Sequence, residues 1–256
     1  MTEQLTTVAK TLQVLEAFSF AEPVLGVSEL ARKLGMGKST VHRSLSTLLA
    51  HGYVIKTPDD RYRLGLKLHE MGQLVVSGLR LHEVAHGPLE RLRVECKETV
   101  HLAVLDGADV VFVEQLESAG LVRVFNRVGR RVPAHATSSG KCLMAYNDGA
   151  VEVVLKRGLR RLAPRTITTK ALLEESLDRV RTLGYSVSVE EGEPGVASVG
   201  APVFGRDGTC IAAVAMAGPA LRLGDEQLTR AVRQVRRCAA EISEAMGFRE
   251  RRSRGA

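Results

Sequence analysis

The sequence lacks a long apolar run. No stretch approaches the roughly 18 uninterrupted apolar residues that a membrane-spanning helix needs. Its first segment, MTEQLTTVAK, has no basic region followed by an apolar core, so a secretory signal is not indicated. We therefore expect a cytoplasmic protein with no membrane partner.

Cysteine is scarce and scattered. The four cysteines, Cys96, Cys142, Cys210 and Cys238, form no C-x-x-C pair. Neither a disulfide framework nor a thiolate zinc site is therefore indicated. We expect free thiols that pack as small apolar side chains.

The composition is that of a globular protein with a basic excess. Of the 256 residues, 45% are apolar and 25% are charged, enough for one large core or two smaller ones. The formal net charge of +7 favours a polyanionic partner. The C-terminal run FRERRSRGA supplies part of this charge, and we expect residues 249–256 to form a disordered basic tail.

Two histidines and a glutamate follow the H-E-x-x-H pattern of helical zinc hydrolases at His82, Glu83 and His86. The longer motif with a third histidine fails, because Leu92 occupies that position. Pro88 is also expected to disturb a continuing helix unless it starts a new one. An apolar stripe at helical spacing places the three polar residues on the flank and outer face: Leu81, Val84, Ala85, Leu89 and Leu92. We interpret them as surface residues and keep a zinc-dependent hydrolase as the alternative function.

The segment TSSGK matches two catalytic motifs in part. Ser138 and Lys141 have the S-x-x-K spacing of serine acyltransferases, but no S-D-N or K-T-G segment follows. A phosphate-binding loop is excluded because His135 replaces its first glycine and Cys142 its magnesium-binding hydroxyl. No other stretch combines a nucleophile, a base and an orienting group, so we predict that the chain is not an enzyme. We interpret TSSGK as a tight turn entering a helix whose free N–H groups can hold an anion.

The strongest pattern, from Val27 to Leu68, predicts a winged helix-turn-helix. One short helix ends at Gly35 and a second ends at Gly52. Two short strands joined by the turn residues PDD follow them. The preceding segment is expected to close a three-helix core through an apolar stripe: Val8, Leu12, Leu15 and either Ala17 or Phe18.

Charge on this segment points to DNA. Between Leu30 and Lys67 there are eight Lys or Arg and only two acids, a surface that can neutralise phosphates. The outer face of the second helix is predicted to carry polar and basic side chains: Lys38, Ser39, Thr40, Arg43, Ser44 and Thr47. We expect Arg43, with His42 and Lys38, to reach base edges, and Arg61 and Arg63 of the wing to contact phosphate or the minor groove. The alternative is a small helical domain that merely has a polar face.

The C-terminal half has the pattern of an α/β domain. Apolar segments predict strands at residues 99–105, 110–113, 121–127, 199–204 and 211–216. Apolar residues at helical spacing predict helices at residues 172–180 and 228–246.

Five blocks in fixed order resemble the IclR family of bacterial transcriptional regulators, over roughly residues 6–248. They are LARKLGMGKSTVHRSLSTLLAHGYV, YRLGLKLHEMG, ETVHLAVLDG, RVPAHATSSGKCLMAY and GYSVSVEEGEPGVASVGAPVFGRDG. The resemblance implies an α/β (α+β) chain with a winged helix-turn-helix domain at residues 1–65 and a linker helix at 66–82. It further implies a GAF-like effector-binding domain at 83–248, with a mixed sheet flanked by helices. Dimers or tetramers that repress or activate nearby genes in response to an organic acid are implied, with no cofactor and no metal at HEVAH.

The resemblance also implies an effector pocket. Leu121, Val124 and Val132 form its apolar wall, Ser138 and Ser139 lie at the turn before a helix, and Ser188, Val196 and Ser198 lie opposite. Family members often have alanine or glycine within SSGKC, and an acid and a cysteine occur at the positions of Ser188 and Ser198. We therefore expect a neutral, hydroxyl-rich pocket for a small anion with a further hydrogen-bonding group, such as an aromatic hydroxy acid. The alternative is that these serines only cap turns.

The expected mechanism is a ligand-biased change of dimer geometry. Two winged helices must lie about one helical turn of DNA apart, or a multiple, on a palindromic operator. The helix expected at residues 66–78 is amphipathic through Leu68, Met71, Leu74 and Val75, and either connects protomers or packs within its own chain. A further alternative is a ligand-binding protein with a vestigial helix-turn-helix, which would lack the steep salt dependence of DNA binding.

Overall fold

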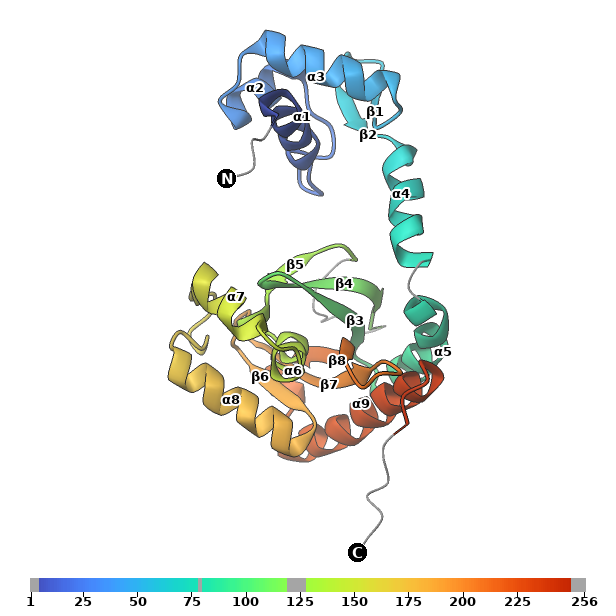
Figure 1. The fold of residues 1–256 in the computed structure, drawn as a ribbon, viewed down its shortest axis with the longest axis vertical. Helices are drawn as coiled ribbons and strands as arrows, with labels where there is room; N and C mark the ends of the chain where they lie inside the picture. Colours follow the sequence, from blue (N-terminus) through green and yellow to red (C-terminus); the bar gives the residue numbers. More distant parts are fainter. Residues whose placement is uncertain (1–4, 78–79, 119–127, 250–256) are drawn as a thin grey trace, which may run out of the picture. The chain divides into compact units, whose positions relative to one another are not determined.

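The computed structural model describes residues 5–77, 80–118 and 128–249. Contacts divide the chain into two compact units, residues 1–78 and 79–256. The elements of each unit are labelled in Figure 1. Among the described helices, none combines the length and the apolar character that crossing a bilayer requires.

The first unit confirms the predicted winged helix-turn-helix. Its helices are α1 (Thr6–Glu16), α2 (Val27–Leu34) and α3 (Lys38–Ala50), and Gly35 ends α2 with a φ of 63°. The wing is the antiparallel pair β1 (Val54–Lys56) and β2 (Tyr62–Leu64), in which Ile55 lies opposite Arg63. The helix α4 (Leu66–Ser77) follows β2.

The core of the first unit corrects the predicted face of α1. Val14, Ala17 and Phe18 are buried against α2 and α3. Val8 and Leu12 are each 52% exposed, so the predicted stripe through these two residues was wrong. The side of α1 that faces α3 instead runs through Thr11 and Val14, because Thr11 is hydrogen-bonded to Ser44 and Val14 is buried in the core.

The second unit is built on a six-stranded sheet in the order β5-β4-β3-β8-β7-β6. All of its described strand pairs are antiparallel, so the expected mixed sheet was wrong in this respect. Its strands are β3 (Thr99–Asp106), β4 (Asp109–Leu116), β5 (Arg131–Pro133), β6 (Ser186–Val189), β7 (Val196–Phe204) and β8 (Cys210–Pro219). Tight connections between neighbouring strands, such as the turn between β3 and β4, favour this antiparallel arrangement.

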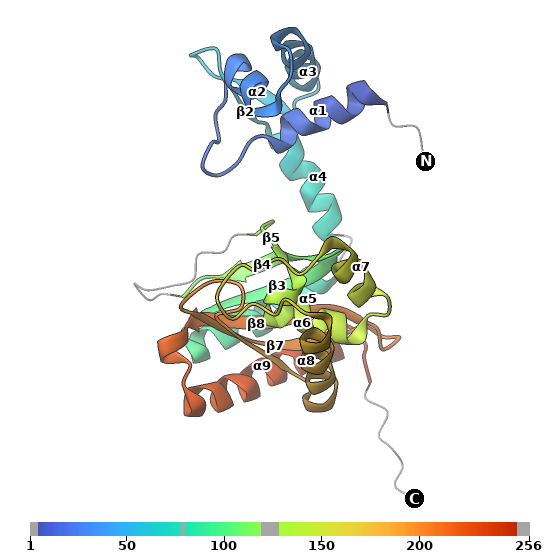
Figure 2. The same cartoon turned by 90° about the vertical axis from the view of Figure 1, so that its left-hand side faces the viewer.

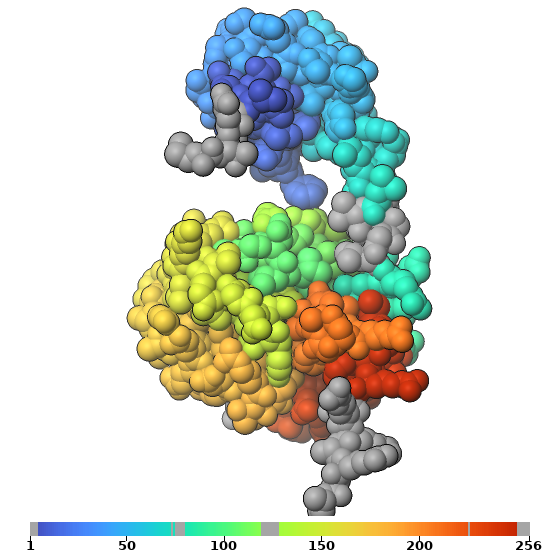
Figure 3. Space-filling model, viewed as in Figure 1, coloured from blue at the N-terminus to red at the C-terminus, as the bar shows by residue number. Residues whose placement is uncertain are grey.

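Helices cover both faces of this sheet, as Figure 2 shows. On one face α5 (Arg80–Cys96) and α9 (Asp225–Ala245) bury apolar residues of β3, β7 and β8. On the other face lie α6 (Ser138–Tyr146), α7 (Ala150–Arg157) and α8 (Lys170–Leu183). In Figure 3, α7 and α8, coloured yellow to gold, cover one side of this unit. Two short 3-10 helices, η1 (Ala134–Ala136) and η2 (Ala220–Arg222), precede α6 and α9.

The predicted elements of this unit are found where the structure describes them. Strands expected at 99–105, 110–113, 199–204 and 211–216 lie within β3, β4, β7 and β8, whereas 121–127 lies outside the described residues. The short strands β5 and β6 were missed, as was α7. The α5 helix continues through Pro88, although a proline was expected to disturb it. The lost hydrogen bond is outweighed by apolar residues of α5 that are buried on both sides of Pro88.

Candidate functional site

The exposed face of α3 carries the first set of candidate residues. Lys38, Ser39, His42, Arg43 and Thr47 are exposed, and their spacing of three, four and five places them along one side of the helix. The opposite side is held in the core by three fully or nearly fully buried residues: Val41, Leu45 and Leu48. This burial fixes the rotation of α3, so its exposed face is a defined surface.

Two residues of that predicted face lie elsewhere. Ser44 is only 6% exposed, and its hydroxyl is hydrogen-bonded to that of Thr11 at 3.1 Å, so its placement on the outer face was wrong. Thr40 lies one helical turn before Ser44 and therefore on the same side of α3, and it is half-buried. Thr47 is exposed, but its hydroxyl donates to the carbonyl of Arg43 at 3.1 Å, as serines and threonines in helices often do.

The two arginines of the wing differ in their contacts. The Nη2 atom of Arg61 donates to Oε2 of Glu29 at 2.8 Å and to the carbonyl of Val24 at 2.9 Å. Glu29 also accepts from the amide of Gly26. This bond makes the largest contribution, and the bond from Arg61 the next largest, to holding the pKa of Glu29 below its usual range. Arg61 therefore ties the wing to the start of α2, whereas Arg63 is exposed on β2.

The second candidate site is a cavity of about 70 Å³ in the second unit, between the sheet and the start of α6. It gathers six of the eight residues that the sequence suggested for an effector pocket: Val132, Ser138, Ser139, Ser188, Val196 and Ser198. Leu121 and Val124 lie outside the described residues. The remaining lining residues were not predicted: His101, Phe112, Arg130, Ala136, Thr137, Gly192, Glu193, Ala215 and Ala217.

The register of the sheet explains why there is space at this place. Paired residues on adjacent strands share a face. One row across the sheet contains only small side chains until it reaches a histidine: Ser186, Gly200, Ala215 and His101. A parallel row is also built of short side chains: Ser188, Ser198, Ala217 and Thr99. Small residues under α6 allow the helix start to approach and leave a space beside it.

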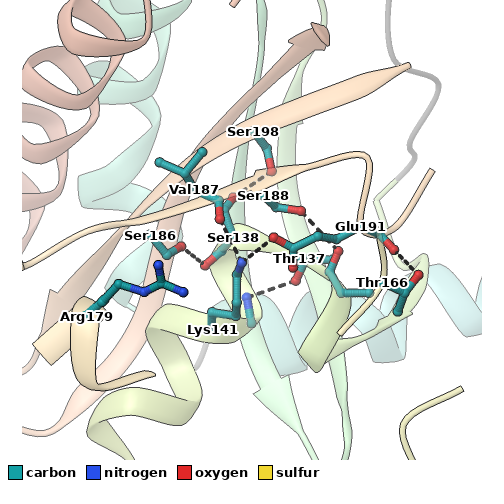
Figure 4. Close-up of polar contacts among 12 residues, drawn as sticks. Thr137, Ser138, Lys141, Thr166, Arg179, Ser186, Val187, Ser188, Glu191 and Ser198 are labelled. Atoms are coloured by element: carbon teal, nitrogen blue, oxygen red, sulfur yellow. Dashed lines mark hydrogen bonds and ion pairs between the residues drawn. The ribbon is translucent and has the colours of Figure 1, made fainter. Parts of the chain in front are cut away.

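The start of α6 supplies polar groups to this space. Thr137 caps the helix, because its hydroxyl oxygen accepts from the amide of Gly140 at 2.9 Å. The amides of Ser138 and Ser139 are first-turn N–H groups with no carbonyl partner within their own helix. The hydroxyl of Ser138 donates to that of Ser198 at 2.8 Å, as Figure 4 shows, and both residues line the cavity. Donors and hydroxyls at a helix N-terminus favour an anion.

His101 is the most informative residue that the sequence interpretation missed. It is buried on β3, and its ring lies 4.6 Å from that of Phe112, centroid to centroid. Burial lowers its pKa to about 4, with a smaller contribution from the positive charge of Arg130. The imidazole is therefore neutral near pH 7, and can offer a ligand a donor or an acceptor without adding charge. The signal that could have drawn attention to it is a histidine inside the apolar run TVHLAVL.

The H-E-x-x-H residues form a contact with a carboxylate. The Nδ1 atom of His86 lies 2.6 Å from Oε1 of the buried Glu114, and that of His82 lies 3.2 Å from Oε2. Glu83 is exposed on the outer side of α5. Within the part of the chain that the structure describes, no group of three or more His, Cys, Asp or Glu is arranged to hold a metal ion. The two histidines thus contact a glutamate of β4 from the surface of α5.

The cysteines take no part in the cavity chemistry. Cys142, Cys210 and Cys238 are buried free thiols, and burial raises the pKa of each to about 12. Cys96 is half-buried, with a pKa raised by burial to about 11. All four are protonated near neutral pH, in agreement with their prediction as small packed side chains.

Comparison with known proteins assigns both units. The family model for the IclR helix-turn-helix domain matches residues 7–58, and that for the bacterial transcriptional regulator IclR C-terminal domain matches residues 73–244. The chain is 34% identical to the transcriptional regulator KdgR of Escherichia coli, over 97% of this chain and 95% of the relative. It is 33% identical to the E. coli regulator XynR, over 94% of this chain and 97% of the relative.

Solved structures agree with this assignment. An IclR homologue from Microbacterium hydrocarbonoxydans, in complex with 4-hydroxybenzoate, has a TM-score of 0.84 and 29% sequence identity. The match covers 94% of this chain and 99% of that one. No finding supports the zinc hydrolase alternative, because the relatives are regulators of transcription. This chain therefore belongs to the IclR family of bacterial transcriptional regulators, which are DNA-binding proteins and not enzymes.

Proposed function

We propose that this regulator binds a palindromic operator as a dimer or tetramer, and that a small organic acid in the cavity changes its affinity for that operator. Residues 1–65 form the DNA-binding domain, and residues 83–248 form the effector-binding domain. Residues 66–82 form the linker between the two domains. An operator in bacterial DNA places the protein in the cytoplasm. The basic tail expected at residues 249–256 lies outside the described residues from position 250 onward.

One observation carries the effector half of the proposal: the start of α6 and two serines of the sheet face one cavity. A carboxylate placed there accepts from the amides and hydroxyls of Ser138 and Ser139, while the helix dipole favours its charge. Val132, Phe112 and Val196 offer apolar contact to the carbon skeleton. This combination of a few polar groups on an apolar wall is usual for small-molecule sites.

We further propose that the acid carries a hydroxyl group. Ser188, Ser198 and the neutral His101 supply further hydrogen-bonding groups on the sheet side of the cavity. An aromatic hydroxy acid is supported by the relative that binds 4-hydroxybenzoate. The size of the cavity constrains this choice: it measures about 70 Å³, and a benzene ring fits a cavity of about 150 Å³ in T4 lysozyme. A ring therefore requires the walls to move apart.

The DNA half is supported by the exposed face of α3. Lys38, His42 and Arg43 project from a helix whose rotation is fixed by its buried side, and are long enough to reach base edges in a major groove. Ser39 is exposed on the same helix, and Arg63 is exposed on the wing. Both suit contact with phosphate. Thr40, Thr47 and Arg61 are weaker candidates, because Thr40 is half-buried and the other two already donate within the unit.

The experiment that tests the effector is a mobility-shift titration of the full chain on DNA from its own promoter region. We expect 4-hydroxybenzoate to change the apparent affinity for DNA, and benzoate, which lacks the hydroxyl, to act at least about tenfold more weakly because buried partners lose a hydrogen bond. Calorimetry with the same two acids gives their affinities directly. Equal potency of the two acids would contradict the hydroxyl, and the absence of any effect over a panel of hydroxy acids would refute the effector site.

The DNA half is tested by Arg43→Ala. If Arg43 reads a base, the variant should bind the operator about 1 to 3 kcal/mol more weakly and discriminate less at one base position. Arg206→Ala, which removes the same charge from an exposed turn of the second unit, is the matched control. Unaltered affinity and base preference in Arg43→Ala would remove this residue from base recognition.

A further inference from the structure

A lysine is buried one turn into the helix that starts at the cavity. The side chain of Lys141 is only 2% exposed. Its Nζ donates to Oε1 of Glu191 at 2.6 Å and to the carbonyl of Val187 at 2.7 Å, as Figure 4 shows. Glu191 is itself 12% exposed. Neither residue takes part in the proposed contacts with the effector.

Glu191 belongs to residues 190–195, the connection between β6 and β7. Its own carbonyl accepts from the hydroxyl of Thr166 at 2.5 Å, so the connection is held from two sides at this residue. The next residue, Gly192, lies so close to η1 that a Cβ there would come within 2.8 Å of the carbonyl oxygen of Ala136. Gly192 and Glu193 then line the cavity. A wall of the cavity is therefore anchored at the residue that precedes it.

The same helix supplies both the anion-binding end of the cavity and the anchor of this wall. Ser138 and Ser139 face the cavity, and Lys141 lies on the same first turns of α6. The Lys141–Glu191 ion pair therefore links this wall directly to α6. If the pair were broken, Gly192 and Glu193 would lose the ion pair of the preceding residue, which holds them near Ser138.

The energetics of the pair argue for positioning more than for stability. Burial lowers the pKa of Lys141 and raises that of Glu191, and each partner only partly offsets the effect on the other. Within the described structure Oε2 of Glu191 has no hydrogen-bond partner. Buried ion pairs of this kind are often matched or exceeded in stability by apolar pairs of similar volume. In some proteins the directional contacts of such a pair fix the position of a segment more uniquely than an apolar pair does.

We propose that the Lys141–Glu191 ion pair is the device that sets the size of the effector cavity, by holding residues 190–195 against the start of α6. This inference rests on the proposed function, because it concerns the selectivity of the same cavity. With the pair intact, the wall limits how large an acid can bind. Releasing the pair lets the wall move outward and favours larger acids relative to small ones.

The first test uses no effector. Hydrogen exchange of residues 190–196 is measured by mass spectrometry in the full-length protein and in Lys141→Met and Glu191→Gln. Both variants should exchange faster in this segment, because local opening becomes easier. Lys170→Met, which breaks an exposed ion pair with Glu174 on α8, is the control and should leave the segment unchanged. Unchanged exchange in both test variants would overturn the proposal.

The second test separates positioning from stability. In Lys141→Met/Glu191→Met an apolar pair replaces the buried charges, so thermal stability should recover relative to the single variants. The exchange of residues 190–196 should remain raised. Affinities for glycolate and 4-hydroxybenzoate are measured in parallel. If the wall is displaced in most molecules, the ratio of the two affinities should shift about tenfold in favour of 4-hydroxybenzoate.

The outcomes are distinguishable. If the double variant regains both the exchange protection and the affinity ratio of the natural chain, the pair is only structural and the proposal fails. If Lys141→Met does not fold, the double variant still decides the question. If neither acid binds the natural chain, the proposed effector fails, while the exchange measurements still report whether the ion pair anchors the wall.

Discussion

At the scale of single residues, His101 lines the cavity and also affects the stability of the second unit. It is almost completely buried, in contact with Phe112 and opposite Ala215 on β8. A charged imidazolium at this place would lose its hydration and face the positive charge of Arg130. The residue is therefore useful to a ligand only as a neutral hydrogen-bonding group.

This environment gives a pH dependence whose sign can be worked out. The pKa of His101 is lowered from 6.5 to about 4 in the folded chain, so the unfolded chain binds more protons between these pH values. The free energy of unfolding should then fall as pH falls from 6.5 to 4, by at most about 3 kcal/mol. His101→Gln should remove this loss, as measured by urea unfolding at a series of pH values.

The control for this measurement is His69→Gln, because His69 lies on α4, outside the second unit and its cavity. This control shows what the loss of one histidine outside the cavity does to the same curves. Parallel curves for the natural chain and His101→Gln would show that His101 is protonated without cost and would contradict the neutral imidazole.

At the scale of elements, the placement of α6 against the sheet depends on a residue without a side chain. A Cβ at Gly200 of β7 would lie 2.9 Å from the carbonyl carbon of Ser138 and 3.1 Å from the amide nitrogen of Ser139. Both are backbone atoms, so the clash cannot be relieved by rotating a side chain. The start of α6 must shift if any other residue is placed there.

Gly200→Ala should therefore destabilise the second unit by about 1 to 3 kcal/mol, as overpacking of a filled interior does. It should also weaken binding of the effector, since the shifted segment carries the anion-binding amides. Gly72→Ala is the matched control: a Cβ at this position of α4 would meet nothing within 4 Å, and the change should stabilise that helix by about 0.5 to 1 kcal/mol. Thermal unfolding and calorimetry measure both effects. If Gly200→Ala left the chain as stable as the natural one, α6 would have room to move.

Individual elements also show which parts of the site can be predicted from the sequence. The segment TSSGK could be interpreted as an anion-binding turn because its cap and first-turn amides are local in the chain. His101 and Phe112 could not be placed in the cavity, because this requires the register between β3, β4 and β8. Ser44 and Val8 were misplaced for a related reason. Helical spacing gives a stripe, but the neighbouring helices decide which part of that stripe is covered.

At the scale of the whole molecule, the proposal is one of linkage between two binding sites in one chain. The effector can change DNA affinity only if it binds the DNA-competent and the DNA-incompetent conformations with different affinities. No direct contact between the effector and DNA is needed. What must exist is a change in the population of conformations that both ligands sense.

Linkage makes a quantitative prediction for the full chain. If a saturating effector changes operator affinity by a given factor, a saturating operator must change effector affinity by the same factor, usually between about 5 and 150. The measurement is calorimetric titration of 4-hydroxybenzoate, or of whichever acid proves active, with and without an operator duplex. Arg43→Ala is the control. At a duplex concentration at which this variant does not bind the operator, its affinity for the effector should be the same with and without DNA. Unequal factors in the natural chain would mean that the acid acts on an assembly step outside this two-site scheme, and a factor of one in both directions would mean that it is not an effector at all.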